Sequence, residues 1–147
     1  MAGATDSRPS VVSDTDPVNL VLDAVPENAA VARRAIADAA EQVGLDAETV
    51  GKARLVVTEA FTNAAAHAYP NGGDGTVEVA AYPDPSGITV VVRDDGEGLR
   101  PRPASGRPSE RLGLVLIAAM ATTTRLRRRP GGGTELRVDI AANGASA

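Results

Sequence analysis

The spacing of apolar residues predicts one half-buried strand and two long helices in the first half of the chain. Val18, Leu20 and Leu22 lie at every second position, which is typical of a strand with one buried face. Beyond them, apolar residues recur at helical spacing in two stretches: Ala32, Ile36, Ala39 and Val43, then Val50, Ala53, Val57, Ala60, Phe61 and Ala64. We therefore expect a strand followed by two helices that each bury one face.

Capping and turn residues set the expected bounds of these helices. Pro26 suits the first turn of the first helix, and Gly44 suits the position just past its end. Asp46 is a typical N-cap for the second helix. The second helix should end near Tyr69, because residues 70–73 have the composition of a turn.

The second half of the chain has the pattern of two hairpins with a helix between them. Residues 76–82 and 88–93 predict the first hairpin, and residues 122–129 and 134–140 predict the second. A third helix is expected from about Leu112 to Ala121. Residues 96–110 are rich in proline, glycine and arginine and are expected to form a mobile loop.

Strands that come in hairpins form a mixed, mostly antiparallel sheet, and helices can then cover one of its faces. The expected fold class is therefore an α/β two-layer sandwich. Residues 83–87 should form the turn of the first hairpin. We expect a single domain over residues 17–141, between a disordered N-terminal tail of residues 1–16 and a C-terminal tail of residues 142–147.

Composition excludes several classes of function. The 147 residues carry a net charge of −4 and only 2% aromatic residues, which disfavours direct nucleic-acid binding. The chain has no cysteine and one histidine, so it can form neither thiolate nor multi-histidine metal sites. No apolar run approaches the roughly 20 residues of a membrane span, and the N-terminus lacks a signal pattern, so no membrane association and a cytoplasmic location are expected.

Glu59 and Asn63 are the first candidates for chemistry. They are four residues apart in the second helix, so their side chains share a face at the edge of the apolar stripe. A carboxylate can deprotonate an attacking hydroxyl, and an amide oxygen can bind Mg²⁺. The alternative is that both are solvated helix residues. His67 follows one turn later and either lines the same site or caps the helix.

Two further segments are candidates for ligand binding. Asp94-Asp95-Gly96-Glu97-Gly98 follows an apolar strand, where an acid can accept a hydrogen bond from an exocyclic amine and glycines allow close approach. Gly113-Leu114 opens a helix whose first amides could bind phosphate. Each segment also has a plain alternative, as an acidic loop and as the end of a loop.

Arg125, Arg127 and Arg129 alternate along the predicted fourth strand. Alternation gives them a common face, which is either solvated or belongs to an edge strand guarded by charge. The more specific interpretation is a docking surface for an acidic protein.

Taken in order, these segments resemble the nucleotide-binding boxes of the GHKL ATPase superfamily, and among its members the bacterial anti-sigma-factor serine/threonine protein kinases. The segment from Glu59 to Tyr69 is similar to the N box, and Asp94 to Gly98 matches the Asp-x-Gly-x-Gly box. Gly113 to Ile117 matches the helix after the ATP lid, and Gly133-Thr134 matches the last box.

The resemblance implies the Bergerat ATP-binding fold, with ATP and Mg²⁺ as cofactors. It makes Glu59 the catalytic general base, Asn63 the metal ligand, Asp94 the contact to the adenine amine, and residues 99–112 the lid. The nucleotide-binding residues that it implies are Asn63, His67, Asp94, Gly96, Gly98, Arg111, Leu112, Gly113, Leu114 and Thr134.

The implied function is that of an ATP-dependent serine kinase that acts as an anti-sigma factor. Its partners would be an anti-anti-sigma protein, phosphorylated on a serine, and a sigma factor, and a homodimer is an implied assembly. The alternative is a nucleotide-gated binding protein of the same fold with little kinase activity. Two departures bear on this choice: Arg111 replaces the first glycine of a Gly-x-Gly, and Thr122 to Thr124 stand where the family often has an aspartate. A third alternative is an ATPase domain of a larger machine, such as a histidine kinase. The sequence gives no sign of the phospho-accepting helix pair or transducer domain that this alternative requires.

Overall fold

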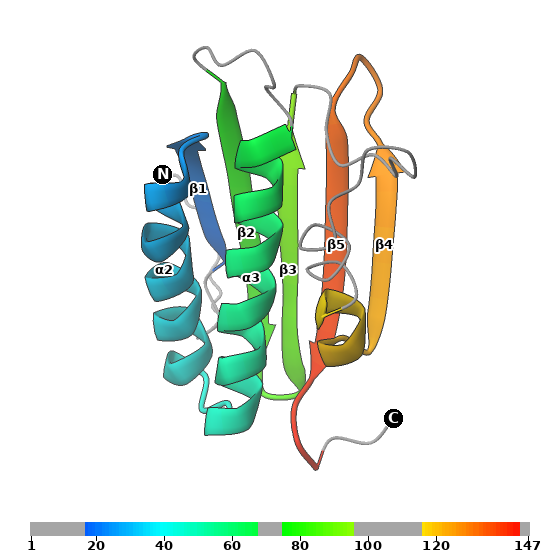
Figure 1. Ribbon diagram of the computed structural model, residues 1–147. Coiled ribbons are helices and arrows are strands. Elements are labelled where there is room, and N and C mark those ends of the chain that lie inside the picture. Colours follow the sequence, from blue (N-terminus) through cyan, green and yellow to red (C-terminus); the bar gives the residue numbers. More distant parts are fainter. Residues whose placement is uncertain (1–16, 68–74, 96–115, 145–147) are drawn as a thin grey trace, which may run out of the picture.

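The computed structural model describes residues 17–67, 75–95 and 116–144, and the other segments are not considered further. Within the described residues, five strands form one antiparallel sheet in the order β1-β2-β3-β5-β4 (Figure 1). The strands are β1 (Val18–Asp23), β2 (Thr76–Asp84), β3 (Gly87–Asp94), β4 (Thr123–Arg128) and β5 (Thr134–Ala141). The tail predicted at residues 1–16, residues 145–147 of the tail predicted at 142–147, the loop at 96–110 and the end of the second helix near Tyr69 lie outside the described residues.

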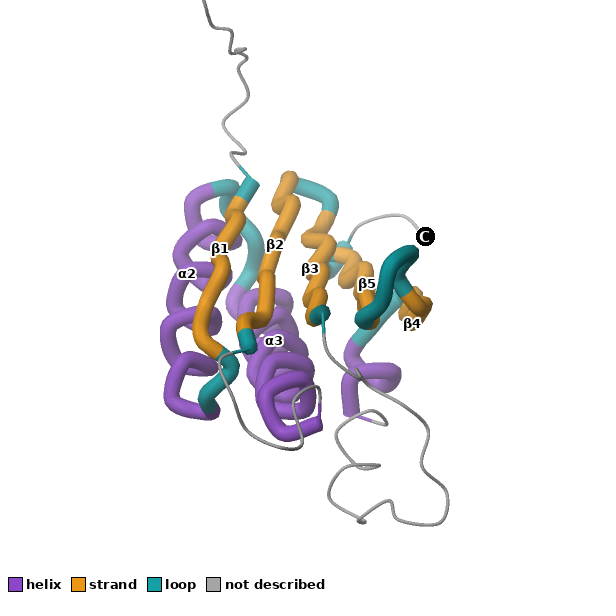
Figure 2. Tube along the Cα trace, turned by 90° about the horizontal axis from the view of Figure 1, so that it is seen from above, coloured by secondary structure: helices purple, strands orange, loops and turns teal. Residues whose placement is uncertain are grey.

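The helices lie on one side of this sheet, as Figure 2 shows from above. A short 3₁₀ turn, η1 (Pro26–Asn28), leads into α2 (Ala29–Gln42), and α3 (Ala47–His67) follows. Residues 116–120 form a further short helix. The predicted two-layer α/β sandwich is therefore confirmed, with an antiparallel sheet as one layer and helices as the other.

The helix α3 contains the best-predicted part of the core. All six residues of its predicted apolar stripe are buried: Val50, Ala53, Val57, Ala60, Phe61 and Ala64. Asp46 caps the helix as expected, because its carboxylate accepts hydrogen bonds from the Thr49 amide at 3.0 Å and the Thr49 hydroxyl at 2.6 Å. These hydrogen bonds lower the pKa of Asp46 to about 2.

The first helix differs in detail from the prediction. Pro26 begins a 3₁₀ turn, and the α-helix starts three residues later at Ala29. The face of α2 that packs into the core includes Ala37 and Ala40, whereas the predicted Ala39 is only half buried. Because α2 has alanines on several faces, the spacing of apolar residues alone does not distinguish which face is buried.

The hairpin between β2 and β3 turns more tightly than residues 83–87 suggested. Asp84 pairs with Gly87, so the turn consists of Pro85 and Ser86 alone. The amide of Ser86 donates a hydrogen bond to the Asp84 carboxylate at 2.7 Å. Pro83 is tolerated in the strand because β1 pairs with β2 only as far as Ala81, so no ladder bond to β1 is lost at the proline.

A row of alternating charges crosses the face of the sheet opposite the helices. The register aligns Glu78, Arg93, Glu135 and Arg127 on four neighbouring strands. Arg93 Nε lies 2.8 Å from Glu135 Oε1, and Arg127 Nε lies 3.2 Å from Glu135 Oε2. The hydrogen bond from Arg93, reinforced by both positive charges, lowers the pKa of Glu135.

No helix among the described residues is long and apolar enough to cross a membrane.

Replacing Glu135 with glutamine should destabilise the fold at neutral pH but not in acid. A carboxylate whose pKa is lowered by folding contributes stability above its usual value of 4.5 and loses that contribution as the pH falls through the folded-state pKa. We expect a loss on the order of 1 kcal/mol at pH 7 that shrinks below about pH 4, measured by urea unfolding. Glu78→Gln, which changes a carboxylate more exposed than that of Glu135, is the control and should cost less. An E135Q effect that is constant with pH would contradict this account.

Candidate functional site

Three of the predicted site residues lie at one end of the domain. Asp94 is the last residue of β3, Thr134 is the first residue of β5, and the two are direct register partners. Asn63 lies one turn before the end of α3, which packs against both strands and ends at the same end of the sheet (Figure 1). The exposed fractions of Asn63, Asp94 and Thr134 are 8%, 3% and 6%, so this end of the sheet buries polar groups.

Glu59 lies on α3 one turn before Asn63 and is half buried. Helical geometry places residues four apart on the same face, so Glu59 borders the buried polar cluster while keeping access to solvent. An acid in this position can accept a proton from a group that approaches from solvent. The alternative in which both residues are solvated is wrong for Asn63, which is buried.

The amide nitrogen of Asn63 is buried and has no hydrogen-bond partner in the part of the chain that the structure describes. A buried, unpaired polar group costs about 1–3 kcal/mol, so native proteins rarely keep one without a reason. A bound ligand that supplies the missing partner is such a reason. An amide side chain offers an oxygen to a cation and a nitrogen to a phosphate or nucleotide acceptor, so Asn63 fits a site for a metal-bound nucleotide.

No group of three or more acidic or histidine side chains that could hold a metal ion occurs among the described residues. Mg²⁺ does not need such a group when phosphates are present, because it retains waters and uses one or two protein ligands. The described donor set therefore fits Mg²⁺ carried in by a nucleotide.

The turn between β4 and β5 packs tightly against the end of β3. Gly133 has a φ of +93°, and a Cβ atom there would collide with the carbonyl oxygen of Asp94 and lie 2.9 Å from the Asp95 Cα. The guanidinium of Arg129 donates hydrogen bonds to the Asp94 carbonyl at 3.0 Å and to the Asp95 carboxylate at 2.7 Å. Sequence reasoning placed Arg129 on a common strand face with Arg125 and Arg127. In the structure β4 ends at Arg128, and Arg129 reaches the candidate site.

The remaining predicted site residues cannot be placed. Gly96, Gly98, Arg111, Leu112, Gly113 and Leu114 lie outside the described residues, and His67 ends α3 without a described side chain. Their assignments stay predictions.

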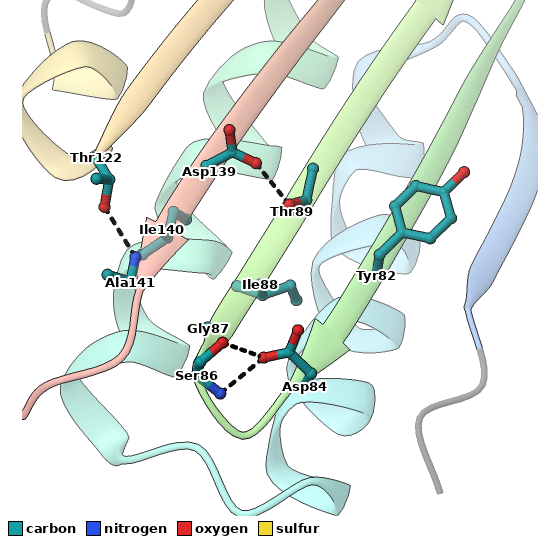
Figure 3. Close-up of a pocket in the computed structure, with 10 residues that line it drawn as sticks. All are labelled: Tyr82, Asp84, Ser86, Gly87, Ile88, Thr89, Thr122, Asp139, Ile140 and Ala141. Carbon is teal, nitrogen blue, oxygen red and sulfur yellow. Dashed lines mark hydrogen bonds between the residues drawn. The ribbon is translucent and has the colours of Figure 1, made fainter. Parts of the chain in front are cut away.

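A small surface pocket of about 190 Å³ lies elsewhere, at the opposite end of the β3–β5 pair (Figure 3). Of its two acidic residues, Asp84 accepts a hydrogen bond from the Ser86 amide, and Asp139 accepts hydrogen bonds from Thr123 and Thr89, both at 2.6 Å, which lower the pKa of Asp139. Because these polar groups are engaged with one another, the pocket is not the candidate site.

Comparisons with known proteins place the chain in a family. Residues 22–140 match the histidine kinase-like ATPase domain, and the chain belongs to this family. Its predicted resemblance to the anti-sigma factor kinases is also confirmed by the relatives that follow. The family is one of ATPase domains, so its members are expected to use ATP.

Two relatives illustrate the similarity. The chain is 30% identical over 82 residues to an anti-sigma F factor of Shouchella clausii, a match that spans 56% of both chains. It is 26% identical over 133 residues to the serine-protein kinase RsbW of Oceanobacillus iheyensis, covering 82% of this chain and 84% of that one. The chain therefore matches about half the length of the first relative and most of the second.

Solved structures show the same fold. The crystal structure of the RsbU and RsbW domains of a Mycobacterium tuberculosis protein aligns with a TM-score of 0.64 at 21% identity, over 89% of this chain and 34% of that chain. A blue-light activated histidine kinase of Erythrobacter litoralis aligns with a TM-score of 0.53 at 28% identity, over 67% and 32% of the two chains.

Replacing Gly133 with alanine should destabilise the protein more than replacing Gly131. Both glycines have positive φ, which costs alanine about 1–2 kcal/mol, but only Gly133 lacks room for a Cβ atom. Overpacking should add a further 1–3 kcal/mol or so, measured as a difference in the free energy of urea unfolding. Equal losses for G133A and G131A would mean that the turn does not press on β3 as described.

Proposed function

We propose that this protein is an ATP-dependent serine protein kinase that acts as an anti-sigma factor. It would phosphorylate a serine of an anti-anti-sigma protein and sequester a sigma factor. The observation that carries the proposal is the buried amide of Asn63, whose nitrogen has no partner within the described residues; it lies one turn from Glu59 and at the same end of the sheet as Asp94. Membership of an ATPase family and the names of the two curated relatives support it.

The proposed roles follow from the position of each side chain. Asp94 accepts a hydrogen bond from the adenine amine, and its burial keeps water from competing for that bond. Asn63 is the protein ligand of Mg²⁺, and Glu59, with access to solvent, receives the proton of the substrate serine. ATP supplies the phosphoryl group, and Mg²⁺ neutralises its charge. Such a transfer needs positioning and charge neutralisation rather than a covalent intermediate on the protein.

A second candidate is a nucleotide-gated regulatory protein with little kinase activity. The observation that favours it is Arg111, which stands where the family usually has the first glycine of the junction after the lid. A side chain at that position restricts the backbone, and closure over the phosphates would be impaired. In this alternative the protein binds the nucleotide but transfers little or no phosphate to a partner.

Nucleotide binding is the first test of both candidates. Calorimetric titration should show that ATP binds, that Mg²⁺ strengthens binding, and that GTP binds far more weakly. Asn63→Ala should abolish most of the Mg²⁺ dependence, because it removes the proposed metal ligand. Thr62→Ala, at the exposed neighbouring position, is the control and should bind as the unmodified protein does. Absence of ATP binding by the unmodified protein would refute both candidates.

Replacing Glu59 with glutamine separates the two candidates. If Glu59 is the general base, E59Q should lower transfer of phosphate from labelled ATP to purified anti-anti-sigma proteins by roughly 100-fold or more, with ATP affinity retained. Glu41→Gln, an exposed acid on α2, controls for the loss of a helical carboxylate. Transfer that is equally fast in E59Q would refute the catalytic role, and no transfer even by the unmodified protein would favour the regulatory alternative.

A further inference from the structure

Arg129 ties the β4–β5 turn to the strand end that carries Asp94. Its guanidinium Nη1 donates to two acceptors on successive residues, the Asp94 carbonyl at 3.0 Å and the Asp95 carboxylate at 2.7 Å. The backbone amide of Arg129 donates to the carbonyl of Gly133 at 2.9 Å, so the arginine is itself held in the turn. Its side chain is 28% exposed, against 73% for Asp95. The contact therefore joins a partly buried guanidinium to an exposed carboxylate.

Two adjacent acids end β3, and only one of them faces inward. Strand alternation sends neighbouring side chains to opposite faces, so Asp94 is buried on the helix side while Asp95 is exposed. A shift or twist at the C-terminal end of β3 would move the Asp94 carboxylate away from its place. Arg129 opposes such a movement because it holds both the carbonyl of Asp94 and the outward carboxylate of Asp95. Gly133, in the same turn, packs directly against the peptide between Asp94 and Asp95.

We propose that Arg129 is a positioning residue that fixes the Asp94 carboxylate for the adenine base and thereby sets the preference for ATP over GTP. This inference rests on the proposed nucleotide site. A carboxylate can only accept hydrogen bonds, and adenine presents an amine where guanine presents a carbonyl oxygen. A rigidly placed Asp94 therefore binds one base and repels the other. A loosened Asp94 can move away from guanine, so both affinity and discrimination fall.

The neighbouring arginines do not share this role. Arg127 pairs with Glu135 across the outer face of the sheet. Arg125 and Arg128 are exposed, and neither makes an ion pair within the described residues. Arg125 is thus a matched control: it is an arginine on β4, the strand that leads to Arg129, and none of its described contacts is with the end of β3.

The experiment is calorimetric titration of ATP and GTP into the full chain and its variants, with unfolding free energy measured in parallel. Arg129→Ala should weaken ATP binding about tenfold or more and lower the ATP-to-GTP affinity ratio. Arg129→Lys should recover part of both, because one ammonium can still donate to the Asp94 carbonyl. Arg125→Ala should match the unmodified protein. Asp95→Asn changes an exposed residue, so it will fold, and should shift the ratio in the same direction by less.

The outcomes separate this inference from the proposed function. Unchanged ATP affinity and ratio in R129A and D95N would overturn the role of Arg129 and leave the proposed function intact. R129A could instead lose ATP affinity only in proportion to its loss of unfolding free energy, with an unchanged ATP-to-GTP affinity ratio. Arg129 would then be a stabilising residue, and this result would also overturn its positioning role. Failure of the unmodified protein to bind either nucleotide would refute the proposed function, and the nucleotide role of Arg129 would fall with it.

Discussion

The packing of α3 against the centre of the sheet is the interaction on which both the core and the candidate site depend. The helix packs against β3 and β5, its small residues Ala53, Ala60 and Ala64 are buried in the core, and the chain's one phenylalanine, Phe61, is fully buried with them. A close-packed interior does not adjust easily, so the helix has a fixed depth and rotation. Asn63 follows Phe61 by two residues and is carried into the buried layer by that geometry. The same contact that stabilises the fold thus places an amide whose nitrogen has no hydrogen-bond partner among the described residues.

The two ends of the β3–β5 pair bury residues of different polarity. At the β2–β3 hairpin, Ile88 and Ile140 are register partners and both are buried, so that end is closed by apolar packing. At the other end the paired residues are Asp94 and Thr134, which are polar and equally buried. Buried polar groups need hydrogen-bond partners, so the chemistry of this end differs from that of the apolar end. The asymmetry along a single pair of strands points to the end where a ligand belongs.

What the sequence could predict depended on how local each signal was. The stripe of α3 and the cap at Asp46 were predicted because helical periodicity and capping involve residues within a few positions of one another. The first hairpin was predicted with too long a turn, because Pro83 is acceptable in β2 only where β1 has already ended, and that is a property of another strand. The partner of Arg129 lies 34 residues away in the chain, so only the three-dimensional structure could reveal it.

The arginines at the end of β4 show how position decides what a charge does. Composition treats Arg125, Arg127 and Arg129 alike, and alternation alone would place them on one solvated face. The structure divides them instead: Arg127 joins the charged row through Glu135, whereas Arg129 lies beyond the strand and holds the end of β3. An exposed ion pair contributes little by itself, so the value of the Arg129 contact is not its strength. Its value is that it restrains the peptide carrying Asp94, the buried acid of the candidate site among the described residues, and so adds to the pairing of that residue with β2 and β5.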